Sequence, residues 1–174
     1  MAYLTALHVT AGALRIALFN LFLLVSCGYA AWRGGAPERI GAGIFLLAAV
    51  LTALVVSPYA SRFHHIEHGL VAVDFAVFAA FFALSLASER FWPLWIASLQ
   101  LIAVGTHLVR LIAPDLIPRA YSEIVTFWAY PMLLLLIVAT RRHELRLNRF
   151  GRDASWKTSS ASAPPKPQPI SQTD

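Results

Sequence analysis

Charged side chains are scarce in this chain. Of its 174 residues, 13% are charged and 58% are hydrophobic, whereas roughly a quarter of the residues in a soluble domain carry charge. So few charges cannot cover a core this apolar with a polar surface. A helix bundle surrounded by lipid needs no such cover, and the composition therefore predicts a membrane protein.

The signals of several other protein classes are missing as well. The single cysteine, Cys27, excludes an internal disulfide and carries no information about the redox compartment. There is no glycine-rich phosphate loop, no nucleophile elbow and no HExxH pair. The net charge of +5 is spread over the predicted loops and the last third of the chain, which argues against a nucleic-acid partner. We therefore expect a protein that is not an enzyme.

Apolar runs, by contrast, fill most of the chain. Each is close to the roughly 20 residues that cross a hydrocarbon core of about 30 Å, and none alternates strictly as the strands of a membrane barrel do. Backbone groups in hydrocarbon are satisfied only within helices or closed barrels. The chain is therefore predicted to be all-α, a polytopic transmembrane helix bundle of about five spans. The predicted spans are residues 16–32, 40–57, 69–87, 92–112 and 122–140.

The chain is predicted to contain one folded domain and a tail. Residues 1–153 comprise the bundle and a basic segment that follows the last span. Residues 154–174 are rich in Ser and Pro and poor in apolar residues, which predicts a disordered tail.

The distribution of arginine predicts the orientation of the bundle. Residues 141–153 contain five Arg against two acidic residues, and the positive-inside bias places such a segment in the cytoplasm. With five spans the N-terminus then lies outside. Residues 24–27 (Leu-Val-Ser-Cys) look like a lipoprotein processing box, but cleavage there would put the basic segment outside, so we expect the first span to be retained. Interfacial Trp residues support this frame and are expected at the inner boundary, at Trp32, Trp92 and Trp95.

The basic segment is also expected to bind lipid. A short interfacial helix over residues 141–150 would place its arginines among anionic headgroups, and the bilayer itself is the expected partner. The candidate headgroup ligands are Arg141, Arg142, Arg146 and Arg149.

Polar side chains within the predicted spans form a candidate site, because such groups are costly in hydrocarbon. Helical spacing places His107 and Arg110 on one face at about the depth of Asp74, which predicts an ion pair of Asp74 with one of them. Either these groups bond one another and fix the helix register, or they line a polar cavity for an ion, a proton or a small molecule. The predicted polar cluster consists of Asp74, His107, Arg110, Gln100, Glu123 and Asn20.

The span that carries Asp74 is expected to be central. Phe78 and Phe81 share the face of Asp74, and a stripe of alanines lies on the opposite face. Because a carboxylate exposed to lipid is energetically unfavourable, both faces of this span are predicted to pack against other helices.

A second group of candidate ligands lies between the second and third predicted spans. If a helix begins there, His64 and His68 are one turn apart with Glu67 beside them, and imidazole with carboxylate suits zinc, iron or copper. The spacing resembles one histidine box of membrane di-iron enzymes, which need several. Haem ligation through His107 is a further alternative. We expect no cofactor, with a transition metal or haem as the alternative. The predicted metal ligands are His64, His65, Glu67 and His68.

Two local runs carry a resemblance to known proteins. Residues 32–39 (Trp-Arg-Gly-Gly-Ala-Pro-Glu-Arg) and 90–95 (Arg-Phe-Trp-Pro-Leu-Trp), together with the Arg-rich segment, resemble small uncharacterised multi-span proteins of the bacterial inner membrane. The resemblance implies a multi-pass protein in that membrane and no particular activity.

Three functions are compatible with the sequence. The first is a non-enzymatic accessory, interaction or structural subunit, in a homo-oligomer or a larger membrane complex. The second is a small transporter or an ion or proton conduit built on the polar cluster. The third is a metal- or haem-binding membrane oxidoreductase.

Overall fold

The described part of the chain is all-helical, as the sequence predicts. The computed structural model describes residues 2–55, 68–112, 118–151, 153 and 155–157, and their side chains except at 2–11, 68, 107–112 and 118–126. Each predicted span coincides with one helix over its described residues, and residues 56 and 57 of the second span lie outside them. The five helices are α1 (Ala2–Arg33), α2 (Ala36–Val55), α3 (His68–Ala87), α4 (Trp92–Ile112) and α5 (Pro118–Phe150).

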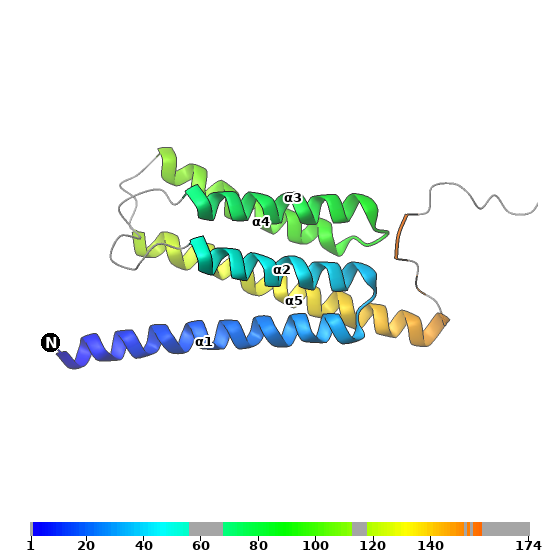
Figure 1. Cartoon of the computed structure of the whole chain (residues 1–174), viewed down its shortest axis with the longest axis horizontal. Coiled ribbons are helices and arrows are strands. Elements are labelled where there is room, and N and C mark those ends of the chain that lie inside the picture. The colour runs from blue at the N-terminus through cyan, green and yellow to red at the C-terminus, as the bar shows by residue number, and fades with distance from the viewer. Residues whose placement is uncertain (1, 56–67, 113–117, 152, 154, 158–174) are drawn as a thin grey trace, which may run out of the picture.

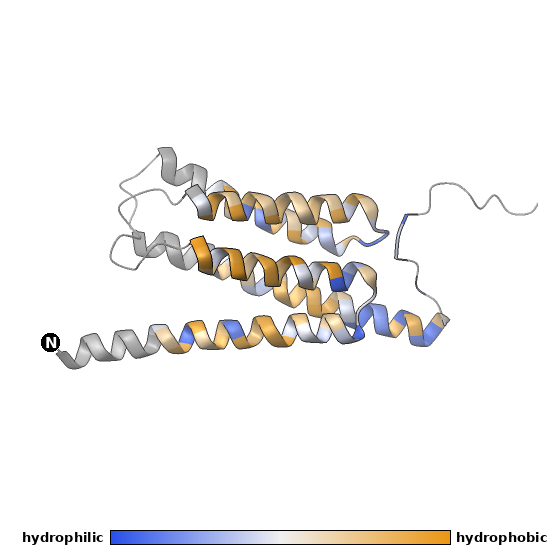
Figure 2. Ribbon diagram, viewed as in Figure 1, coloured by the Kyte–Doolittle hydropathy of each residue, from blue (hydrophilic) through white to orange (hydrophobic). Residues whose placement is uncertain are grey.

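Three of these helices are long and apolar enough to cross a membrane. The apolar stretches are Gly12–Arg33, Ala36–Val55 and Gly69–Ala87, and α4 has a shorter one, Trp92–Thr106, among its described residues. Many large apolar side chains are exposed on the outside of the bundle. Figure 2 shows that hydrophobic residues make up most of α2 and α3. Leu54, for example, is 75% exposed and Phe75 is 59% exposed. Surfaces of this kind are unfavourable in water and favourable in lipid.

The helices form a closed ring in which each helix packs against its neighbours in sequence. α5 returns to contact α1, and α2 also contacts α5 across the ring. The connections between α1 and α2 and between α3 and α4 are short and lie at the same end of the bundle (Figure 1). The last part of α5 extends beyond the bundle at this end. We call this end, which comprises residues 29–39, 85–95, 138–151, 153 and 155–157, the basic end.

The prediction that α3 is central is wrong. α3 packs against α4 and α2, and it leaves Ala72, Phe75 and Ala76 exposed. Asp74 is nevertheless only half-exposed, because its side chain faces α4. One inward face therefore suffices to shelter the carboxylate, and the opposite face of α3 is left at the surface of the bundle.

A short segment after α5 returns to the α3–α4 connection. The backbone N–H of Lys157 donates to the carbonyl oxygen of Ala87 at 3.1 Å, and Ser88 and Trp156 form an isolated antiparallel bridge. We call residues 153 and 155–157 the strap. Residues 155–157 belong to the segment that the composition assigns to the tail, while 158–174 lie outside the described residues.

Close packing at the basic end depends on glycine. A Cβ atom at Gly34 would clash with the carbonyl oxygen of Ala30, so the two-residue turn between α1 and α2 requires glycine there. A Cβ atom at Gly41 would lie 2.6 Å from the buried ring of Trp92. Glycine at this position therefore allows α2 to approach the start of α4.

Replacing Gly41 with Ala is expected to destabilise the bundle by about 2 kcal/mol, because overpacking displaces the Trp92 ring. The matched control is Gly43→Ala on the same helix, where an added Cβ meets nothing within 4 Å. That control is expected to stabilise by about 1 kcal/mol through helix propensity. Unfolding of both variants in mixed detergent micelles measures the change in the free energy of unfolding. Equal changes in the two variants would contradict the explanation from packing against Trp92.

Candidate functional site

Asp74 of α3 and Gln100 of α4 meet inside the bundle. The Nε2 of Gln100 donates to Asp74 Oδ1 at 3.0 Å, and it lies 3.3 Å from the backbone carbonyl oxygen of Asp74. Gln100 is 4% exposed. A hydrogen bond from an amide to a carboxylate offsets part of the penalty for placing both groups away from water. Two members of the predicted polar cluster are therefore in direct contact.

A cavity of about 360 Å³ lies beside this pair and is lined by residues of all five helices. Its polar lining comes from Asn20, Thr52, Asp74 and Gln100, and the remaining lining is apolar. Asn20 on α1 and Ala53 on α2 line the cavity and are exposed, which places its mouth between these helices. The space exists because small side chains face it, namely Ala48, Ala49, Ala53, Ala103 and Ala129.

The structure thus brings three members of the predicted polar cluster, Asn20, Asp74 and Gln100, to one cavity. The other three lie on helices whose backbone is described, His107 and Arg110 on α4 and Glu123 on α5. Their side chains lie outside the described part of the structure. The ion pair of Asp74 with His107 or Arg110 therefore stays a prediction.

An apolar layer separates this cavity from the basic end. Along α3, Phe81 follows the cavity residue Val77, and along α4, Ile96 precedes Gln100. Leu136 follows the cavity residue Leu133 along α5. Phe81, Ile96 and Leu136 are each fully buried. The polar lining of the cavity does not continue through this layer.

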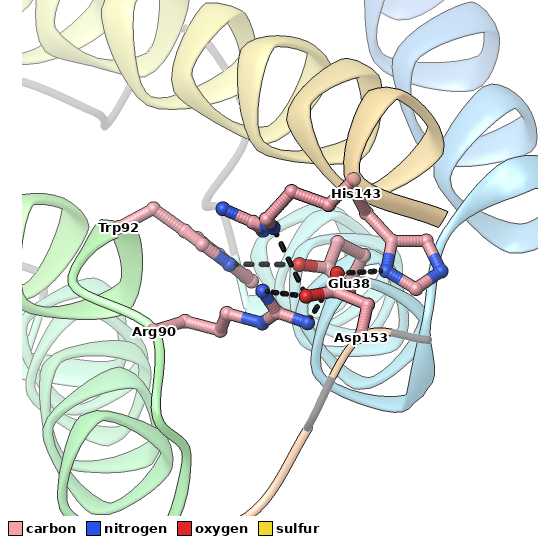
Figure 3. Close-up of polar contacts among 6 residues, drawn as sticks. Glu38, Arg90, Trp92, His143 and Asp153 are labelled. Atoms are coloured by element: carbon pink, nitrogen blue, oxygen red, sulfur yellow. Dashed lines mark hydrogen bonds and ion pairs between the residues drawn. The ribbon is translucent and has the colours of Figure 1, made fainter. Parts of the chain in front are cut away.

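At the basic end, Asp153 of the strap is held by three side chains (Figure 3). Arg90 Nη1 donates to Asp153 Oδ1 at 2.8 Å, and Arg90 Nη2 lies 2.5 Å from Oδ2. The Nε of Arg146 donates to Oδ1 at 3.0 Å, and the Nδ1 of His143 is 2.6 Å from Oδ2. The side chains of Arg90 and Asp153 are each 6% exposed. This cluster fastens the strap to α5 and to the α3–α4 connection.

The partners of Asp153 keep it ionised. Burial alone raises the pKa of this carboxyl group, but the hydrogen bonds from Arg90 and His143 and the charge of Arg90 outweigh burial. The pKa of Asp153 therefore lies below its ordinary value. The carboxylate is charged at neutral pH, as the ion pair with Arg90 requires.

Glu38, in the first turn of α2, is fully buried near this cluster. The Nε1 of Trp92 donates to Glu38 Oε1 at 3.1 Å (Figure 3). Glu38 Oε2 has no hydrogen-bond partner among the described residues. The start of a helix favours a carboxylate through its dipole. Trp92 is therefore a buried hydrogen-bond donor, whereas Trp32 is 76% exposed and Trp95 is 65% exposed. All three lie at the basic end, and their place at a membrane boundary stays a prediction.

A separate charge cluster joins α1 to α5. The hydroxyl of Tyr29 donates to Glu144 Oε2 at 2.6 Å, and Glu144 also pairs with Arg33 and with Arg141, each at 3.3 Å. The hydrogen bond from Tyr29, together with the two arginines, lowers the pKa of Glu144. The hydrogen bond to Glu144 in turn raises the pKa of Arg141.

The four arginines predicted to meet lipid headgroups differ in their surroundings. Arg141 and Arg146 are paired with Glu144 and Asp153. Arg142 is exposed and forms no ion pair with any described side chain. Arg149 is exposed and lies 6.0 Å from the ring centroid of Phe150.

Sequence reasoning missed the roles of Glu38, Arg90, His143 and Asp153. A signal was present, since all four fall at the same predicted membrane boundary as the arginines. Hydropathy, however, treats such residues as exposed charges of the loops. It does not predict which of their side chains are buried at the ends of the helices.

The predicted metal ligands are not brought together in the part of the chain that the structure describes. His64, His65 and Glu67 lie outside it, as does the side chain of His68. Elsewhere among the described residues, no three His, Cys, Asp or Glu side chains are grouped so that they could hold a metal ion. A metal or haem site at this loop stays a prediction.

Comparison with known proteins found no match to this chain among family models, curated proteins or solved structures. The function therefore has to be argued from the cavity and from the charges of the basic end.

Replacing Asp153 with Asn is expected to lower the stability of the bundle by about 2 kcal/mol, because the buried guanidinium of Arg90 loses its counter-charge. Heat unfolding in detergent micelles, followed by circular dichroism, measures the loss. The control is Glu144→Gln, whose arginine partners are 55% and 66% exposed and which should have a smaller effect. An equal loss in both variants would contradict the special role of Asp153.

Proposed function

We propose that this chain is a multi-pass membrane protein that holds a small amphipathic molecule between its five helices. The observation that carries the proposal is the cavity of about 360 Å³ beside Asp74 and Gln100. Sites for small molecules have volumes of roughly 300–1,000 Å³, and they are mostly apolar with a few polar groups that orient the ligand. The carboxylate of Asp74 favours a ligand with a cationic or hydrogen-bond-donating group.

The proposed protein crosses the membrane five times. Three helices are apolar and long enough to span by themselves, and α4 and α5 complete the same ring. Arginines gather at the basic end, where Arg33, Arg39 and Arg90 lie with the arginines of the last part of α5, Arg141, Arg142, Arg146 and Arg149. The positive-inside bias supports a cytoplasmic basic end and an outer N-terminus. The inner membrane of a bacterium is proposed only from the resemblance carried by residues 32–39 and 90–95.

Binding is favoured over conduction by the apolar layer below the cavity. A conduit needs a polar path across the bundle, whereas the fully buried side chains of Phe81, Ile96 and Leu136 lie between the cavity and Glu38. A cavity that opens between α1 and α2 and ends at this apolar layer suits a protein that retains a ligand. Such a binding protein is one form of the non-enzymatic accessory subunit that the sequence favours.

Filling the cavity tests the binding function. Ala103→Leu is expected to remove an amphipathic compound that copurifies with the wild-type protein, because the larger side chain takes its place. The measurement is solvent extraction of the purified protein followed by mass spectrometry. Asp74→Asn keeps the size of the side chain and should lower the amount of bound compound by about tenfold through loss of its charge.

The matched control is Ala79→Leu, which makes the same change at an exposed position on α3. It should leave the bound compound unchanged. If the wild-type protein and this control carry no compound, and if Ala103→Leu only raises the unfolding temperature, the cavity is a packing void and the proposal is wrong.

Reporter fusions at the two termini test the orientation. A reporter that is active only in the cytoplasm is expected to work at the C-terminus, and one that is active only outside is expected to work at the N-terminus, because five crossings separate the ends. Two ends on the same side would contradict the five-span topology and leave the cavity experiment unaffected.

A further inference from the structure

We propose that the basic end carries a binding site for the headgroup of an anionic phospholipid, in a pocket between α4 and α5. This site is distinct from the central cavity. The pocket has a volume of about 250 Å³ and is lined by Arg90, Arg142 and Arg146 on its polar side. Its apolar side comes from Trp95 and from residues of α5 that include Val138. An arginine-lined pocket between helices, next to the membrane, fits a phosphate-bearing lipid.

The charges of the pocket are set up for one negative group. Three guanidinium groups line it, together with the carboxylate of Glu89. Two further carboxylates lie nearby and have partners within the protein: Asp153 pairs with Arg90 and Arg146, and Glu38 accepts the ring N–H of Trp92. Arg142 forms no ion pair with a described residue, and a phosphodiester, which carries one negative charge, would supply its partner.

The arginines of the pocket have different tasks. Asp153 holds Arg90 and Arg146 in place through their ion pairs, so these two side chains are ordered before a lipid arrives. The Nε of Arg90 is buried and has no acceptor among the described residues. Arg142 is exposed, lines the pocket and makes no ion pair with a described residue. It is therefore the arginine that supplies the unbalanced charge.

The apolar side of the pocket favours a lipid over free phosphate. Trp95 is 65% exposed and Phe91 is 81% exposed, and both line the pocket at the start of α4. Val138, which lies one turn before Arg142 on α5 and also lines the pocket, is 45% exposed. Aromatic residues of this kind lie at the boundary between headgroups and acyl chains. Phosphate would contact only the arginines, whereas a phospholipid would also cover these apolar side chains.

The pocket changes which arginines are expected to matter for lipid binding. Arg141 faces Glu144 and Tyr29, and Arg149 lies beyond the pocket near the end of α5. Arg90 comes from the α3–α4 connection, far from the basic segment in sequence. Arg90, Arg142 and Arg146 line one pocket of defined shape. Charges scattered over a surface form no such pocket.

Native mass spectrometry of the full-length protein in a neutral detergent tests the site. Phosphatidylglycerol is titrated against phosphatidylcholine with the same acyl chains, and phosphatidylglycerol should bind more tightly. Arg142→Gln is expected to weaken its binding about fivefold, the effect of one arginine near a membrane surface. Arg142→Lys should retain most of the affinity. Inorganic phosphate at equal concentration should not displace the lipid.

The matched control is Arg149→Gln, which removes the same charge from an exposed position on the same helix and should leave the affinity unchanged. Equal weakening by Arg142→Gln and Arg149→Gln would mean that the attraction is diffuse and would overturn the proposal. Displacement of phosphatidylglycerol by inorganic phosphate would overturn the assignment to a lipid.

Discussion

A polar side chain within a lipid-embedded bundle needs a partner inside the protein, and this requirement shapes both sites of this chain. Gln100 turns toward Asp74 because neither group can be left to hydrocarbon. Asp153 folds back under the helix ends because Arg90 is buried there. The first pair ties α3 to α4, and the second ties the strap to the α3–α4 connection. Asp74 and Gln100 line the central cavity, and Arg90 lines the pocket at the basic end.

Hydropathy predicted the helices well, since a span is a property of about 20 neighbouring residues. Within the described residues, each of the five expected spans coincides with a helix. Helical spacing also identified Asn20, Asp74 and Gln100, which line one cavity. The position of α3 in the ring was predicted wrongly, because a stripe of small residues is equally compatible with a neighbouring helix and with lipid. Sequence spacing says which residues share a face and cannot say what that face meets.

The cluster at the basic end could not be predicted for a related reason. Its members come from residues 38, 90, 92, 143 and 153, and no local pattern links them. They meet because two short connections and the end of α5 lie at the same end of the bundle (Figure 1). Gly34 and Gly41 permit this close approach, since a side chain at either position would meet the Ala30 carbonyl or the Trp92 ring. The requirement for glycine is visible only once the helices are in place.

The apolar layer between the two sites has a consequence for how they work together. In the described part of the chain, the fully buried side chains of Phe81, Ile96 and Leu136 lie between the cavity and the arginines, so an electrostatic effect of one site on the other has to cross low-dielectric packing. Phe81 also contacts Trp92, with ring centroids 6.2 Å apart, and Phe45, at 4.9 Å. Phe45 lines the cavity, whereas Trp92 lines the lipid pocket and bonds Glu38. The contacts of these three rings therefore form one continuous packed path between a ligand in the cavity and a lipid at the basic end.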